Sequence, residues 1–115
     1  MSDFKVQIRK INKASVIDLQ GYLDAHTAAV LENHLMELIN LGDVQIVVNF
    51  RDLQYISSAG LGVFMAYIED VRDKNGDIKL CAMSPKVYNV FDLLGFPVLY
   101  DITESEQEAL DKFNV

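Results

Sequence analysis

The 115-residue sequence is poor in the residue types on which several classes of protein depend. Its single cysteine, Cys81, excludes an intrachain disulfide and a cysteine metal cluster. Ten Lys and Arg stand against seventeen Asp and Glu, and the net charge of −7 argues against nucleic acid as a partner. No apolar run is long enough to span a bilayer, and the N-terminus lacks the pattern of a signal peptide. These absences predict a cytoplasmic protein that binds neither nucleic acid nor membrane.

Signatures of enzymes are also missing. The sequence has no phosphate-binding loop, no complete dinucleotide-binding fingerprint and no G-x-S-x-G elbow. The two histidines, His26 and His34, lie eight residues apart on one predicted helix, which is too far for a shared metal ion. We therefore expect no catalytic residue, no metal and no cofactor.

What the sequence does have is the pattern of one folded domain over residues 1–115. Half of the residues are apolar, and their spacing alternates between strand and helix periods. A hairpin is expected first, followed by alternating helices and strands, which gives an α/β domain with a mixed sheet of about five strands flanked by about four helices. Strands are expected near residues 4–8, 14–19, 44–50, 78–83 and 97–102.

Helix boundaries have their own signals in the sequence. Asp24 or Thr27 can cap the first helix, and Gly42 follows it in the usual C-terminal position. Ser84 followed by proline predicts the start of a later helix. Residues 103–106 (TESE) match a capping box for a terminal helix.

Residues 56–64 (ISSAGLGVF) form the stretch around which the chain is organised. They follow the apolar strand predicted over residues 44–50 and lead into a helix, so Ser58 is predicted to be the N-cap. Gly60 and Gly62 each cost a helix roughly 1 kcal/mol relative to alanine. Their presence in the first turn therefore indicates either close packing within the fold or the close approach of a partner.

Residues 49–63 (NFRDLQYISSAGLGV) resemble the signature of STAS-domain anti-sigma factor antagonists. Residues 21–24 (GYLD), 80–90 and 91–96 (FDLLGF) are similar to three other motifs of that family, so the resemblance covers nearly the whole chain. It implies a regulator rather than an enzyme. The partners it implies are an anti-sigma factor that is a serine kinase with a Bergerat-type ATPase fold, and a PP2C-type phosphatase.

The resemblance also implies which residues act. Ser58 matches the serine that the kinase phosphorylates to inactivate its antagonist, and Asp24 matches an acidic residue at the partner surface. The family commonly has Asp before the phosphoacceptor, whereas this sequence has Ser57, which makes Ser57 a second choice for the phosphorylation site. The implied partner-binding set is Asp24, Ser57, Ser58, Ala59, Gly60 and Gly62, on a protein that is a monomer when free.

Two other functions remain open from the sequence. A STAS domain can also be a binding subunit that is never phosphorylated, for example in a lipid transporter. A small serine hydrolase would need a histidine within hydrogen-bond reach of Ser58, and His26, just after Asp24, is the candidate for that role.

Overall fold

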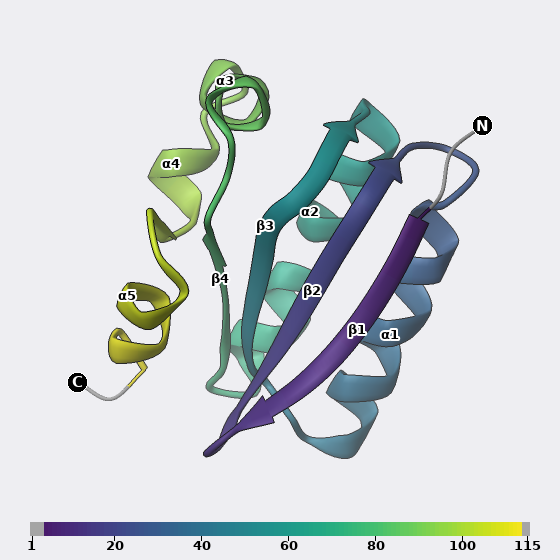
Figure 1. Ribbon diagram of the computed structural model, residues 1–115. Helices are drawn as coiled ribbons and strands as arrows, with labels where there is room; N and C mark the ends of the chain where they lie inside the picture. The colour runs from purple at the N-terminus through teal and green to yellow at the C-terminus, as the bar shows by residue number, and fades with distance from the viewer. Residues whose placement is uncertain (1–3, 114–115) are drawn as a thin grey trace.

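The computed structural model describes residues 4–113, which form a five-stranded mixed sheet with helices on both of its faces (Figure 1). The strands lie side by side in chain order; the first pair is antiparallel and the others are parallel. Their bounds are β1 Phe4–Ile11, β2 Ala14–Leu23, β3 Gln45–Ile56, β4 Asp77–Cys81 and β5 Ile102–Thr103. The predicted α/β class, with its hairpin and mixed five-stranded sheet, is confirmed.

The helices within the described residues are α1 Ala28–Leu41, α2 Ser58–Asp73, α3 Pro85–Leu93, α4 Phe96–Leu99 and α5 Glu106–Asp111. Crossovers between parallel strands are right-handed, and the strand order never reverses, so α1, α2 and α3 all lie on one face of the sheet. We call this the helical face. On the other side, the open face, only α5 packs on the sheet within the described residues, through Ala109 and Leu110. None of the helices over residues 4–113 has the length and apolar character needed to cross a membrane.

A cluster of phenylalanine rings fills the helical face behind β3. Phe91 of α3 meets Phe50 of β3 edge to face at 5.3 Å between ring centroids, and meets Phe96 of α4 in the same way at 5.0 Å. Phe64 of α2 packs against both Phe50 and Phe91. Such pairs contribute about 0.5–1.5 kcal/mol each beyond their burial. The cluster therefore fixes α2 and α3 relative to the end of β3.

Strand β3 continues past its predicted end at Phe50 to Ile56. Its pairing with β2 shifts register twice, because β3 carries an extra residue at each of two bulges. The core-facing residues Phe50, Leu53 and Ile56 are consequently three positions apart rather than two. A search for strict alternation does not detect a strand with this spacing.

The last strand was predicted over residues 97–102, and of these only Ile102 lies in a strand; the prediction is wrong for residues 97–101. Gly95 adopts a left-handed conformation with φ +77°, and the short helix α4 follows, with Pro97 in its first turn. Proline suits that position because its missing N–H would have no helical partner. Strand β5 is reduced to two residues, and α4 is one helix more than the predicted set. The terminal capping box also lies two residues later than predicted, between Ser105 and Glu108.

Candidate functional site

The parallel strands β2 and β3 end side by side and bring Asp24 next to Ser57. Leu23 and Ile56 are paired in register, and the backbone N–H of Ser57 donates to the carbonyl of Leu23 at 2.9 Å. The next residues of both strands therefore share one rim of the sheet, at the carboxyl ends of the strands.

Ser57, not Ser58, is the N-cap of α2. Its backbone is extended, with φ −99° and ψ 173°, and its hydroxyl accepts a hydrogen bond from the N–H of Gly60 at 3.4 Å. The prediction that Ser58 caps the helix is wrong because the helix begins one residue earlier, at Ser58 itself. A cap needs a non-helical backbone, and the hydrogen bond to β2 holds Ser57 in one.

The remaining first-turn residues divide into exposed and buried ones. Ser58, Ala59 and Gly62 are exposed, and the Ser58 hydroxyl has no hydrogen bond to any other residue over 4–113. Gly60 is buried: a Cβ there would lie 2.7 Å from Cγ of Leu23, whereas a Cβ on Gly62 would meet nothing within 4 Å. Gly60 thus serves the packing of α2 on β2, and Gly62 leaves free space above the surface.

Asp24 is half-buried and organises the turn between β2 and α1. Its Oδ1 accepts from the N–H of His26 at 2.9 Å and from the N–H of Thr27 at 3.2 Å. Thr27 occupies the N-cap position of α1 but makes no side-chain capping bond. The free backbone N–H groups of this turn are therefore satisfied by the side chain of Asp24. Its other oxygen, Oδ2, has no hydrogen-bond partner among the described residues.

Two residues next to this rim were not predicted from the sequence. Tyr22 and Tyr55 lie side by side on the open face, with ring centroids 5.8 Å apart, and are 41% and 44% exposed. Each immediately precedes one of the paired strand-end residues, Leu23 and Ile56. The signal that would have found Tyr55 is the three-residue step of β3, which places it opposite the core.

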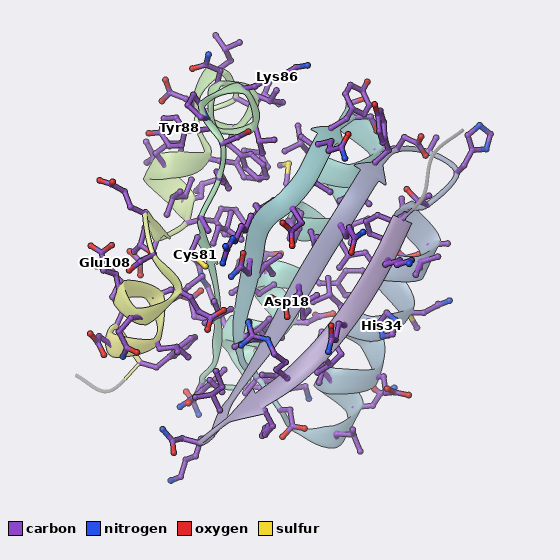
Figure 2. The ribbon with its side chains drawn as sticks, in the orientation of Figure 1. Asp18, His34, Cys81, Lys86, Tyr88 and Glu108 are labelled. Atoms are coloured by element: carbon purple, nitrogen blue, oxygen red, sulfur yellow. The ribbon has the colours of Figure 1, made fainter. Side chains whose placement is uncertain are left out.

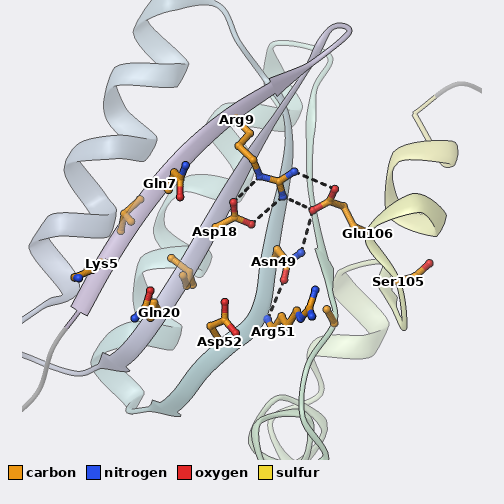
Figure 3. Close-up of a pocket in the computed structure, with 13 residues that line it drawn as sticks. Lys5, Gln7, Arg9, Asp18, Gln20, Asn49, Arg51, Asp52, Ser105 and Glu106 are labelled. Carbon is orange, nitrogen blue, oxygen red and sulfur yellow. Dashed lines mark hydrogen bonds and ion pairs between the residues drawn. The ribbon is translucent and has the colours of Figure 1, made fainter.

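A hollow with a volume of about 920 Å³ lies elsewhere, on the open face between the hairpin and α5 (Figure 3). A polar network crosses it. Arg9 holds Asp18 with two hydrogen bonds of 2.6 and 2.9 Å, and it also binds Glu106 of α5. Asn49 donates to Glu106 at 2.9 Å. The hydrogen bond from Arg9 is the main cause that lowers the pKa of Glu106. It is therefore the charged form of Glu106 that connects α5 to the sheet.

Within the described residues, no hydrogen bond joins either histidine or Cys81 to Ser58. His26 is exposed and shares no hydrogen bond with Ser58, while His34 lies on α1 and Cys81 on β4 (Figure 2). Burial raises the pKa of the Cys81 thiol to about 12, which keeps it protonated in the core. Over residues 4–113, no group of three His, Cys, Asp or Glu side chains is placed to hold a metal ion.

Comparison with known proteins identifies the family of this chain. The sequence profile of the STAS domain matches residues 5–109. The chain belongs to the STAS-domain family. BtrV of Bordetella bronchiseptica is 31% identical to this STAS domain over 109 residues, which cover 95% of this chain and 94% of BtrV. An anti-sigma F factor antagonist of Paenibacillus polymyxa is 29% identical over 101 residues, which cover 87% and 86% of the two chains.

A solved structure extends the likeness to three dimensions. SpoIIAA, an anti-sigma factor antagonist, matches this STAS domain in its unphosphorylated form with a TM-score of 0.76 and 25% identity, over 96% of this chain and 98% of SpoIIAA. Its phosphorylated form from Bacillus matches with a TM-score of 0.73, also at 25% identity, over 96% and 99%. The resemblance to anti-sigma factor antagonists is thus confirmed, and at least one relative exists in two phosphorylation states.

Proposed function

We propose that this STAS domain is a cytoplasmic anti-sigma factor antagonist controlled by phosphorylation of Ser58. In its unphosphorylated form it binds an anti-sigma factor that is a serine kinase of the Bergerat type, so that a sigma factor is released. The kinase then phosphorylates Ser58 and ends the interaction, and a PP2C-type phosphatase restores it. The protein is a monomer when free and needs no cofactor.

The observation that carries this proposal is the different environment of the two adjacent serines. The Ser57 hydroxyl is engaged as the helix cap, whereas the Ser58 hydroxyl is exposed and free of hydrogen bonds to the described residues. A kinase needs an accessible hydroxyl, and Ser58 is exposed, whereas Ser57 is only partly exposed and its oxygen is held against the N–H of Gly60. The geometry therefore favours Ser58 as the acceptor.

A phosphate on Ser58 is compatible with the fold. It adds about −1.5 to −2 charges at neutral pH, in the first turn of α2, where a negative charge gains about 0.3–1 kcal/mol from the helix dipole and free N–H groups. The surface around it is built of small residues, Ala59 and Gly62, and carries the carboxylate of Asp24. A bound partner that fits this surface of small residues closely has no room for a phosphate group, so phosphorylation is expected to block binding rather than to unfold the helix.

Phosphorylation in vitro tests the proposal. Incubation with the anti-sigma factor kinase and Mg-ATP is expected to add one phosphate, which mass spectrometry of the peptide containing both serines locates on Ser58. Ser58→Ala is expected to take up no phosphate. The matched variant Ser57→Ala is expected to be phosphorylated normally and to be less stable by about 1 kcal/mol. Full phosphorylation of Ser58→Ala would disprove the assignment.

A further inference from the structure

The paired tyrosines lie directly next to the proposed binding rim. Tyr22 and Tyr55 are opposite each other in the parallel register, one residue before Leu23 and Ile56 on their strands. The pairing of those two residues is what brings Asp24 beside Ser57. The two rings therefore continue the rim onto the open face without an intervening element.

A β-bulge creates this pair. The register of β2 and β3 runs through Gly21 with Leu53 and then shifts, so that Tyr22 meets Tyr55 and Gln54 is the additional residue. Without the shift, Gln54 would lie opposite Tyr22. Bulges commonly occur beside functional sites, where they redirect a side chain, and here the bulge gathers two large aromatic side chains on one patch of surface.

The fold itself makes little use of the two rings. Within residues 4–113, the aromatic contact of each ring is with the other, and neither hydroxyl has a hydrogen bond to a described residue. Neither ring belongs to the buried clusters of the two faces. Two half-exposed aromatic rings in contact are the type of surface that anchors protein interfaces.

The charged residues around the two tyrosines indicate which kind of partner side chain they bind. Asp52, exposed on β3, precedes Tyr55 on the same face, and Asp24 with its unpaired Oδ2 follows Tyr22. Two cations are also near, Arg51 in the same stretch of β3 and Lys5 of β1, which is paired with Gln20. The chain as a whole carries a charge of −7. The faces of aromatic rings attract cations, by about 0.5–1 kcal/mol when exposed and 2 kcal/mol or more when desolvated.

We propose that Tyr22 and Tyr55 anchor the anti-sigma factor kinase by receiving one of its lysine or arginine side chains over their rings, between the carboxylates of Asp24 and Asp52. This inference rests on the proposed function and extends the binding surface beyond the first turn of α2. It assigns the open-face end of β2 and β3 to the same partner that phosphorylates Ser58.

Calorimetric titration of the kinase with single variants tests the anchor. Tyr22→Ala and Tyr55→Ala are each expected to weaken binding about tenfold or more, as interface anchors do. Tyr22→Phe and Tyr55→Phe keep the ring and are expected to bind within about twofold of the wild type. Tyr55→Leu keeps apolar area without an aromatic face, and its affinity is expected to lie between the two. Leu41→Ala, which also shortens an exposed apolar side chain but at the far end of α1, is the matched control and is expected to bind normally.

The outcomes separate this inference from the proposed function. If the wild type neither binds the kinase nor is phosphorylated by it, the proposed function is wrong, and the proposal that the two tyrosines bind the kinase is wrong as well. If the wild type binds and both alanine variants bind equally well, the function stands and the anchor is wrong. If Tyr55→Leu binds with full affinity, the ring of Tyr55 does not bind a cation of the kinase, and that part of the proposal is wrong. Melting temperatures of all variants detect unfolding; if an alanine variant unfolds, the phenylalanine and leucine variants decide the question, since both keep a large side chain.

Discussion

Two polar regions of this STAS domain differ in how their side chains are satisfied. In the network of the open face, Arg9, Asp18, Asn49 and Glu106 pair with one another across β1, β2, β3 and α5. At the first turn of α2, the Ser58 hydroxyl and one oxygen of Asp24 have no partner among the described residues. A hollow of about 920 Å³ belongs to the first region, yet the second has the polar groups without a partner among the described residues.

From this difference we expect stability and binding to depend largely on different residues of this fold. Groups that are already paired hold elements together, and changing them alters the free energy of unfolding. If the proposed function is right, changing the groups that the fold leaves unpaired is expected to alter the affinity for the partner more than the free energy of unfolding. The following experiments are designed to separate these two quantities.

The largest expected effect is that of Ser58→Glu, which places a permanent negative charge in the first turn of α2. A charge buried without a partner in an interface costs on the order of 3–5 kcal/mol, a loss of affinity by a factor of hundreds or more. The helix dipole tolerates the same charge, so the melting temperature is expected to stay within about a few degrees of the wild type. Calorimetry with the kinase and thermal denaturation measure the two quantities.

Two results would contradict this expectation for Ser58→Glu. Normal binding by Ser58→Glu would show that the first turn of α2 lies outside the interface. Loss of helical circular dichroism would show that the charge acts by disrupting α2. Ser57→Ala is the companion variant, because it changes the neighbouring hydroxyl without adding charge.

A smaller effect is expected from adding one methyl group to either glycine of α2. Gly60→Ala forces a contact of 2.7 Å with Leu23 and is expected to cost about 1–3 kcal/mol of stability through overpacking. Gly62→Ala meets no atom within 4 Å, and the gain in helix propensity, up to about 1 kcal/mol, is expected to stabilise the free protein. Urea denaturation measures both changes.

Binding measurements on the same two variants sharpen the test. Gly62→Ala is expected to weaken the kinase complex because its methyl group stands on the exposed surface, while the folded fraction of Gly60→Ala is expected to bind normally. A more stable Gly62→Ala that binds with full affinity would exclude Gly62 from the proposed interface.

The sequence predicted the regular parts of this molecule and missed the irregular ones. The hairpin, α1 with its stop at Gly42, and the Ser84 cap followed local rules of period and capping, and they are confirmed. The end of β3 was missed because two bulges change its period from two to three, and a three-residue step is not the alternation by which a strand is recognised. For the same reason the sequence did not reveal that Tyr22 and Tyr55 meet.

For the two serines, the sequence predicted their position in the fold better than their roles. The motif placed both serines at the start of α2, but choosing between them as the cap required the backbone of Ser57, which a hydrogen bond to Leu23 sets. Similarly, no pattern in the sequence announced the pairing of Arg9 with Glu106, since 97 positions separate them and the contact depends on how α5 returns to the sheet.

The smallest expected effect comes from Glu106→Gln in the polar network. Arg9 and Glu106 are partly exposed, at 37% and 24% of their side chains, and ion pairs of this kind contribute at most about 1 kcal/mol. The variant is therefore expected to be less stable than the wild type by about 0.5–1 kcal/mol near neutral pH. Because this region is paired within the fold, the affinity for the kinase is expected to stay unchanged.

The pH dependence of that difference identifies its cause. Arg9 lowers the pKa of Glu106 below its ordinary value of 4.5, so the folded protein binds this proton less readily than the unfolded chain does. The carboxylate then stabilises the fold at pH values above about 4.5, and this contribution is lost as the pH falls through the lowered pKa. The difference between wild type and Glu106→Gln, measured by urea denaturation, is expected to shrink between neutral pH and about pH 3. Glu104→Gln removes a carboxylate that makes no ion pair within residues 4–113 and is expected to show no such trend. A difference that stays constant with pH would mean that Glu106 acts by packing and not by its charge.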